Sequence, residues 1–483
     1  MLRGKRCGGR DVSAGLPRHL RRRAPGRDFA AHHRDQPDRI PHLSRAVVSH
    51  LYEARAYTEA PRAKCAWGID RDWPGFSGEG AADVAIIGAG FTGLSAALTL
   101  AEAGVCVTVL EAQVPGWGAS GRNGGFCCIG GTALPDAMLT KRFGTDGAQR
   151  FLETQPAAID HVSALIERHA LDVQRHSDGE VLLAHSARAA KSFADEARAC
   201  EAQGLPAQVL SKADLDARGL GGPGFHAGLH LRKGFGLDAG AYVTGLAHAA
   251  RAAGARIYGQ SPVQNLDKSG DRWRLSTPAG TLTANRILVA TNGYTPERLG
   301  PLRAPVLPIQ SNVLVTRPLT HDEQAAQGWT SDLMAYDARS LLHYFRLMPD
   351  GRFLFGMRGG IRATARAEAR TTRRLLAHFH AMFPAWRHVD IPYTWSGLLA
   401  YSRDLLPHVT EIGGDPSAIA AMAYHGNGVA MGTWSGHAAA RLMLGDDIRP
   451  APMRTHLTPF PLAPLRRNIL RLGYPFAAIR DAL

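Results

Sequence analysis

The segment that most constrains the fold is a glycine-rich turn that follows a short apolar run. Asp83-Val84-Ala85-Ile86-Ile87 is typical of a buried parallel strand. The turn Gly88-Ala89-Gly90-Phe91-Thr92-Gly93 comes next, and apolar residues then recur at helical spacing at Leu94, Ala97, Leu98 and Ala101. Strand, glycine turn and helix together predict the start of a βαβ unit that binds a dinucleotide.

Each glycine of this turn has a physical role in such a unit. Gly88 permits the tight turn, Gly90 lets the backbone approach a pyrophosphate, and Gly93 lets the helix pack closely on the strand. The helix N-terminus supplies free N–H groups and the positive end of a dipole for the phosphates. The next predicted strand, residues 105–110, ends at Glu111, whose carboxylate is expected to accept hydrogen bonds from ribose hydroxyls.

A second stretch fits the same glycine pattern but lacks its context. Gly219-Leu220-Gly221-Gly222-Pro223-Gly224 follows Asp-rich sequence without strand character. Pro223 stands where a helix should begin to propagate, so we interpret this stretch as a loop.

Two further loops of small residues favour FAD over NAD. Residues 116–126 follow Glu111 directly, and a backbone this bare can wrap a large cofactor. Arg122 is expected to pair with a phosphate, and Ser120 and Asn123 to bond the ribityl chain or the flavin edge. The turn at residues 424–429 precedes a predicted helix from about Val429 to Leu444, whose N–H groups would stabilise reduced flavin near N1 and C2=O. The predicted FAD contacts in these segments are Gly88, Gly90, Phe91, Thr92, Gly93, Glu111, Ala112, Gly118, Ala119, Ser120, Arg122, Asn123, Gly124, Gly125, Gly426, Asn427, Gly428, Val429 and Ala430.

Charge is concentrated at the N-terminus. The 483 residues carry a net charge of +14, and residues 1–47, with twelve Arg or Lys and four Asp, account for +8 of it. We interpret residues 1–47 as a disordered basic arm and expect no nucleic-acid partner, because a terminal basic excess does not make a groove that follows phosphates. A nucleic-acid-associated flavoprotein that uses this arm is the alternative from another class. A further hypothesis is that translation starts downstream, near Val47 to Leu51.

Composition excludes several other classes of protein. No run of 18 apolar residues occurs, so we expect no transmembrane segment, and without an apolar N-terminal leader we expect a cytoplasmic location. The six cysteines include no CxxC pair, and no Cys/His set has zinc spacing, so we expect free thiols and no metal site.

Helical and strand patterns alternate in a way that predicts an α/β fold, with a Rossmann-like FAD-binding domain interleaved with a β-rich α+β substrate domain. After the arm, the predicted FAD-binding segments are 48–175, 231–302 and 393–445, the predicted substrate-domain segments are 176–230 and 303–392, and 446–483 forms a C-terminal tail with one short helix near Leu465 to Leu472.

The combination of motifs resembles the D-amino-acid-oxidase-type family of FAD-dependent amine and amino-acid oxidoreductases. The resemblance covers roughly residues 48–475 and is closest to the γ-glutamylputrescine oxidoreductase branch. The stretches that carry it are residues 83–93, 110–112, 116–125, 290–294, 349–352, 395–397, Asp404 with Pro407, 426–430 and 459–466.

This resemblance implies contacts and chemistry that the motifs alone do not. It places the backbone of Val263 at the adenine and Ala290 and Thr291 near the ribose and phosphates. It implies non-covalent FAD, because no Cys follows Cys200 and no His stands in residues 118–125 to tether the flavin. Relatives in the putrescine branch show Ser and His at the positions of His425 and Asn427, and a proline where this chain has Ala239, which leaves the substrate open.

The resemblance implies oxidation of a C–N bond. An amine with a free lone pair would pass a hydride to flavin N5, giving an imine that water hydrolyses, and no strong base is required. We expect a small amine or amino acid, either γ-glutamylputrescine-like or N-substituted, with O₂ as acceptor and H₂O₂ as product. A dehydrogenase that passes electrons to a quinone or carrier remains an alternative, as does a plain NAD dehydrogenase. The candidate substrate contacts are Tyr344, Arg346, Tyr401, Tyr424 and His425.

Overall fold

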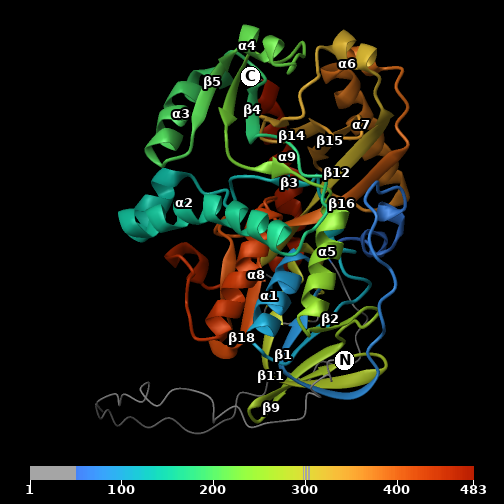
Figure 1. Ribbon diagram of the computed structural model, residues 1–483, viewed down its shortest axis with the longest axis vertical. Coiled ribbons are helices and arrows are strands. Elements are labelled where there is room, and N and C mark those ends of the chain that lie inside the picture. The colour runs from blue at the N-terminus through green and yellow to red at the C-terminus, as the bar shows by residue number, and fades with distance from the viewer. Residues whose placement is uncertain (1–50, 297–298, 300–301, 303–304, 483) are drawn as a thin grey trace.

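Two eight-stranded sheets lie at opposite ends of the long axis of the molecule (Figure 1). The computed structural model describes residues 51–296, 299, 302 and 305–482, and the predicted arm at residues 1–47 lies outside them. The architecture confirms the predicted fold class of a Rossmann-like domain interleaved with a β-rich domain. None of the helices in the described ranges combines the length and the apolar character needed to cross a membrane.

The first sheet is built around a parallel core. Its order is β17-β18-β11-β1-β2-β8, with the antiparallel strands β10 and β9 added beside β11. The central strand β1 runs parallel to both β2 and β11, and residues 84–87 are buried because helices and loops cover both faces. Its strands are β1 (Gly78–Ile87), β2 (Val107–Leu110), β8 (Arg256–Tyr258), β9 (Asn265–Ser269), β10 (Arg272–Ser276), β11 (Gly280–Val289), β17 (His408–Ile412) and β18 (Asp415–Met422).

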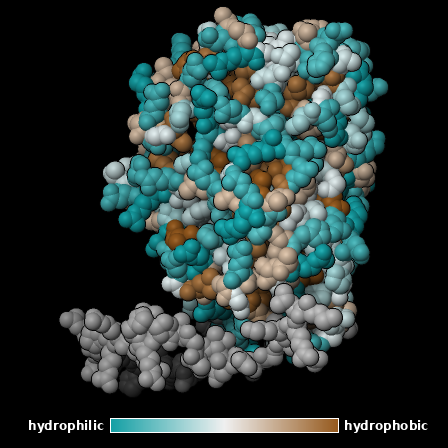
Figure 2. All heavy atoms as spheres, in the orientation of Figure 1, coloured by the Kyte–Doolittle hydropathy of each residue, from teal (hydrophilic) through white to brown (hydrophobic). Residues whose placement is uncertain are grey.

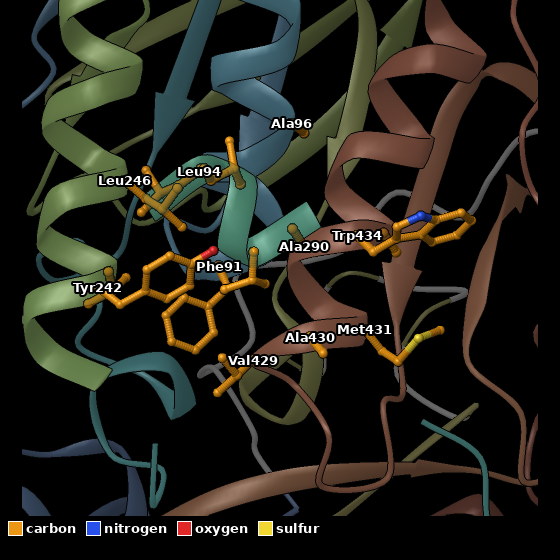
Figure 3. Packing of buried hydrophobic residues seen from close by; sticks show 14 of the residues in the cluster. Phe91, Leu94, Ala96, Tyr242, Leu246, Ala290, Val429, Ala430, Met431 and Trp434 are labelled. Atoms are coloured by element: carbon orange, nitrogen blue, oxygen red, sulfur yellow. The ribbon is translucent and has the colours of Figure 1, made fainter. Parts of the chain in front are cut away.

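Three helices pack side by side against this sheet (Figure 3). They are α1 (Phe91–Glu102), α5 (Ala239–Ala252) and α8 (Ala430–Met443), which confirms the helices predicted after the glycine turn and near residue 429. α1 is apolar on almost every side because it lies between the sheet and the other two helices. A Cβ on Gly436 of α8 would lie 2.1 Å from the Thr92 carbonyl oxygen, so this glycine allows α1 and α8 to approach closely.

A long helix crosses the middle of the molecule (Figure 1). α2 (Asp136–Arg168) is interrupted at Gly144, which has φ 72° and ψ 171°. It packs against α8, where the His161 and His437 rings lie 4.5 Å apart. This helix was not among the predicted elements, because its apolar positions are spread among many charged ones.

The second sheet has the order β16-β12-β15-β14-β13-β4-β6-β5. Phe353 and Phe355 on one of its faces pack against Phe379 of α7 (Ala365–Met382). Side chains alternate along each strand, so the opposite face carries Tyr344, Gly356 and their neighbours toward the first sheet. Its strands are β4 (Glu180–Ala184), β5 (Ala207–Ser211), β6 (Ala227–Leu231), β12 (Val306–Pro318), β13 (Met334–Asp337), β14 (His343–Leu347), β15 (Arg352–Arg358) and β16 (Tyr393–Ser402).

One predicted domain boundary needs correction. The FAD-binding segment predicted at 393–445 includes β16, but β16 pairs along its whole length with β12 in the second sheet. A strand's own side-chain pattern does not specify which sheet it joins, because pairing depends on distant residues. We therefore place this boundary after Ser402, and the remaining divisions stay predictions.

The C-terminal segment contains more structure than a tail with one short helix. α9 (Arg467–Ala482) is twice as long as the stretch predicted near residues 465–472. The Asp481 carboxylate accepts hydrogen bonds from the Ser340 and Leu341 N–H groups, so α9 holds the connection before β14. The remaining described elements are α3 (Phe193–Ala202), α4 (Lys212–Ala217), α6 (His321–Gln327) and the paired strands β3 (Phe126–Cys127) and β7 (Phe235–Gly236).

The molecular surface shown in Figure 2 is mostly hydrophilic, with apolar residues scattered in small groups. Apolar side chains that stand singly on a surface are normal for a folded protein. The structural basis of function is therefore sought inside the molecule, between the two sheets.

Candidate active site

A cavity of about 620 Å³ lies between the first sheet and the second sheet. One wall comes from the loops at the ends of β1, β2 and β11 and from the turn before α8. The other wall is the face of the second sheet opposite α7. All of the predicted FAD-binding residues line this cavity except Gly93, Gly125 and Ala430, which stand just behind the wall.

The glycine turn after β1 depends on close backbone contacts. Gly88 has φ +102°, and a Cβ there would lie 2.9 Å from the Ala290 carbonyl oxygen. A Cβ on Gly93 would lie 1.9 Å from the Gly88 carbonyl oxygen, so only glycine lets α1 begin this close to the strand. These contacts support the roles predicted for Gly88 and Gly93.

Glu111 closes the same turn from the end of β2. Its Oε2 accepts a hydrogen bond from the Ala89 N–H at 2.8 Å, and its Oε1 accepts one from the Gln113 N–H at 3.0 Å. Burial raises the pKa of Glu111, and these N–H groups act in the opposite direction. Each carboxylate oxygen keeps a second lone pair, which fits the ribose contact predicted for this residue.

The loop at residues 116–125 is held by hydrogen bonds within the loop and to neighbouring segments. Ser120 Oγ accepts from the Phe91 N–H at 2.9 Å, so this side chain caps the start of α1. Both N–H groups of the Asn123 amide donate to carbonyls within the loop, those of Ala119 and Ser120. Asn123 therefore shapes the loop, and its amide donors are already used.

Arg122 offers the donor that this loop needs for a ligand. Its guanidinium stacks over the Trp117 ring at 4.1 Å, and its Nε donates to the Trp117 carbonyl oxygen at 2.8 Å. Its Nη2 is buried and has no hydrogen-bond partner among the described residues. A buried donor without a partner is costly, so a phosphate or flavin oxygen in the cavity fits this position.

The turn before α8 is fixed to the rest of the cavity by Tyr424 and His425. The Thr92 hydroxyl donates to the Tyr424 hydroxyl at 2.9 Å. His425 Nε2 accepts from the Ser402 N–H at 3.3 Å, which leaves Nδ1 to donate to the Gly131 carbonyl oxygen at 3.1 Å. Burial lowers the pKa of His425 to about 4, so the ring is neutral near pH 7. Both side chains line the cavity, but each holds the turn in place.

The structure contradicts one predicted substrate contact. Arg346 is 1% exposed and does not line the cavity. Its Nε donates to the Gly124 carbonyl oxygen at 3.0 Å, and its Nη2 donates to the Leu237 carbonyl oxygen at 2.8 Å. Its Nη1 contacts His176 Nε2. Arg346 shares the inner sheet face with Tyr344, but its hydrogen bonds hold the loop at residues 116–125.

Arg358 is the cavity arginine that sequence reasoning missed. It ends β15, and its Nη1 donates to the Tyr401 hydroxyl at 2.9 Å. Its Nη2 donates to the His425 carbonyl oxygen at 3.2 Å. Tyr344 lines the same wall and shares a hydrogen bond with Ser311 at 2.9 Å. A polar residue two positions from Gly356, at the end of a strand whose interior is apolar, was the signal available in the sequence.

A buried carboxyl group was missed as well. Glu180 begins β4, is 1% exposed and lines the cavity beside Cys128 and Tyr336. Burial raises the pKa of Glu180 to about 8, against smaller opposing effects of the Ile129 N–H and the Cys128 thiol. Nothing in a short apolar strand marks its first residue as part of a distant site.

Comparison with known proteins gives the family. The sequence profile of the DAO family, described as FAD dependent oxidoreductase, matches residues 83–442. The chain belongs to the DAO family of FAD-dependent oxidoreductases. It is 32% identical over 387 residues to the probable oxidoreductase OrdL of Rhizobium meliloti, which covers 77% of this chain and 85% of the relative.

Two further similarities agree with this assignment. The chain is 28% identical over 410 residues to the γ-glutamylputrescine oxidoreductase of Escherichia coli, covering 83% of this chain and 93% of that protein. The crystal structure of glycine oxidase from Geobacillus kaustophilus has a TM-score of 0.64 at 21% identity, covering 78% of this chain and all of that one. The DAO-family fold and the predicted resemblance are therefore confirmed.

The cofactor of this DAO-family chain fits the first-sheet side of the cavity. Two helix N-termini, the unpartnered Arg122 donor and the Glu111 carboxylate all lie on that side. Helix N-termini and a cationic donor suit phosphates, and a carboxylate suits a ribose. The contacts of individual residues with FAD stay predictions.

Proposed function

We propose that this enzyme oxidises the C–N bond of an amine or amino acid that also carries a carboxylate. The observation that carries the proposal is one cavity in which the predicted FAD loops face Arg358, held by Tyr401 and the turn before α8. Two relatives named for such chemistry, a γ-glutamylputrescine oxidoreductase and a glycine oxidase, support it.

FAD, when bound, supplies the hydride acceptor for the reaction. The protein's part is to orient the substrate and exclude water. Arg358 pairs with the substrate carboxylate, and the Tyr401 hydroxyl fixes the guanidinium. Tyr344 and Tyr336 form the apolar wall beside the substrate. The amine donates its lone pair as its α-hydrogen leaves as hydride. The resulting imine takes up water to give a carbonyl compound and either ammonia, from a primary amine, or an amine, from an N-substituted one.

We further propose O₂ as the electron acceptor and H₂O₂ as the second product, in line with the relatives named as oxidases. We also propose that FAD is held without a covalent bond. Among the described residues, Cys128 is the cysteine that lines the cavity. Burial raises the pKa of its thiol well above the usual value, which keeps it a poor nucleophile. Formation of H₂O₂ on turnover tests the proposed acceptor. Release of the flavin when the protein is precipitated with acid tests the proposed non-covalent binding.

The central experiment is anaerobic mixing of the yellow holoenzyme with γ-glutamylputrescine, glycine and N-methyl amino acids. We expect at least one to bleach the flavin. If none does so while dithionite reduces the same sample fully, the proposed function is wrong.

A variant then tests the role of Arg358. Arg358→Met should raise KM at least about tenfold for substrates with a carboxylate, because a charge-assisted hydrogen bond is lost. KM for amines without a carboxylate should change little. Arg362→Met is the matched control, since Arg362 is exposed and does not line the cavity. An equal KM increase for both substrate classes would exclude a carboxylate contact.

A further inference from the structure

One oxygen of a buried carboxyl group at the cavity wall has no partner. Glu180 Oε1 accepts a hydrogen bond from the Ile129 N–H at 3.1 Å. Its Oε2 is buried and has no hydrogen-bond partner among the described residues. The thiol of Cys128 stands beside the carboxyl and lowers its pKa as a hydrogen-bond donor, but it is not a partner of Oε2. Polar groups buried in this way are normally satisfied, so the free oxygen indicates a ligand.

The surroundings of Glu180 supply no positive charge. No described Lys, Arg or His forms an ion pair with Glu180, and its pKa reflects only burial, the Ile129 N–H and the Cys128 thiol. The neighbouring Cys128 and Tyr336 are both uncharged near neutral pH, because burial raises the pKa of each. An ionised Glu180 is therefore a buried negative charge that no described cation compensates, and a cationic ligand would stabilise it.

Glu180 and Arg358 lie on the same sheet face, three strands apart. Glu180 lies on β4 and Arg358 on β15, with β13 and β14 between them. Three steps between neighbouring strands correspond to roughly 14 Å across the sheet, and the register separates the two residues further along the strands. Both residues line the cavity, so a molecule that touches both needs opposite charges separated by a chain of several atoms.

We propose that Glu180 binds a cationic amine of the substrate, so that this enzyme selects molecules with an ammonium group well separated from their carboxylate. N-Aminoalkyl conjugates of amino acids belong to this class, because they carry an ammonium group in addition to the amine that is oxidised, whereas α-amino acids are too short. The inference rests on the proposed function for the carboxylate end at Arg358 and extends it to a second charged subsite.

The competing explanation is structural: Glu180 could serve only to hold Ile129. The Glu180→Gln variant separates the two explanations. Glutamine keeps an oxygen that can accept from the Ile129 N–H, but it cannot carry the negative charge. Glu153→Gln on α2 is the matched control, because Glu153 is exposed and the change in net charge is the same.

The test compares ligands that differ in one charged group. Holoenzyme is titrated at about pH 9, above the pKa of Glu180, with 6-aminohexanoate and with hexanoate, and binding is read from the absorbance change of the oxidised flavin. Wild type and Glu153→Gln should each bind 6-aminohexanoate at least about tenfold more tightly than hexanoate, as expected for a charge-assisted hydrogen bond. Glu180→Gln should bind both ligands about equally, with an unchanged melting temperature or a higher one.

Two outcomes would overturn this inference. One is wild-type protein that binds hexanoate as tightly as 6-aminohexanoate, and the other is a Glu180→Gln variant that keeps the wild-type preference. A series of 4-, 6- and 8-carbon ω-amino acids adds a length test, and tightest binding of the 4-carbon member would contradict the charge separation. Neither result depends on turnover, so a failure here remains distinct from failure of any amine to bleach the flavin.

Discussion

The two walls of the cavity are built in different ways. The first-sheet wall is made chiefly of backbone: glycine turns, two helix N-termini and loops whose side chains bond to nearby backbone groups. The second-sheet wall is made of side chains that project from one strand face, with Glu180, Tyr344 and Arg358 drawn from three strands. A backbone wall tolerates few substitutions but leaves a readable sequence pattern, whereas a side-chain wall can change its specificity one residue at a time.

The largest effect should come from placing a side chain in the backbone wall. Gly93→Val forces atoms toward the Gly88 carbonyl oxygen, where even a Cβ would lie at 1.9 Å. We expect destabilisation beyond the about 1–3 kcal/mol typical of an overpacked core, and colourless protein without FAD. Gly224→Ala, in the second glycine pattern, meets open space and is the control. Flavin absorbance and thermal melting are measured for both variants. A yellow, stable Gly93→Val protein would contradict the view that the backbone wall tolerates substitution less well than the side-chain wall.

The two arginines of the inner sheet face should respond differently to the same change. Arg346→Met leaves the buried Gly124 and Leu237 carbonyls without a donor, which should cost about 3 kcal/mol in the free energy of unfolding and loosen FAD. Arg358→Met should leave the melting temperature nearly unchanged while it weakens the binding of substrates that carry a carboxylate. Denaturant unfolding measures the loss of stability in each variant, and KM for carboxylate substrates measures the loss of binding. A stable Arg346→Met protein with impaired substrate binding would restore the prediction that Arg346 contacts substrate.

Buried titratable groups on the two walls should give opposite pH dependence of stability. Burial raises the pKa of Glu180 from 4.5 to about 8, so its contribution is complete below about pH 4.5 and is lost as pH rises through about 8. Burial lowers the pKa of His425 from 6.5 to about 4, so its contribution is complete above about pH 6.5 and is lost as pH falls through about 4.

Variants make this difference measurable. The melting temperature of Glu180→Gln relative to wild type should increase between about pH 5 and pH 8, and that of His425→Gln should increase relative to wild type as pH falls from about 6.5 to 4. The expected differences are a few °C. Parallel curves for wild type and Glu180→Gln would show that the carboxyl keeps an ordinary pKa.

The smallest effect should come from a side chain that only supports the backbone wall. Ser120→Ala removes the cap on the Phe91 N–H, which should cost about 1 kcal/mol and weaken FAD binding a few-fold. Titration of apoprotein with FAD checks this, with Ser192→Ala as control because Ser192 makes no side-chain cap bond to α3. A loss as large as that of Gly93→Val would mean that Ser120 contacts the cofactor directly.

This contrast also explains what the sequence could predict. The turns predicted to bind FAD line the cavity, and they could be located because glycines, Glu111 and the flanking apolar runs follow one another along the chain. Asn123 was assigned to the ligand although its amide closes its own loop, since the sequence does not show which groups bond to one another.

The second-sheet wall could not be predicted in the same way. Arg346 and Arg358 are both on strands with similar patterns, and only the register of β14 against β15 and the connecting loops decides which of them faces the cavity. Glu180 enters the site through β4, whose pairing with β13 joins residues more than 150 positions apart. Such contacts depend on tertiary pairing that no local pattern records.

The interleaved order of segments has a consequence for the timing of assembly. β1 needs β11 beside it, β11 needs β18, and the turn at residues 424–429 completes the cavity that the turn at residues 88–93 begins. At roughly 5–20 residues per second, a ribosome takes on the order of 20–70 s to add the intervening chain. The early βαβ unit must wait for that time without the partners that complete its binding site. Cofactor capture is therefore expected to follow synthesis of nearly the whole chain.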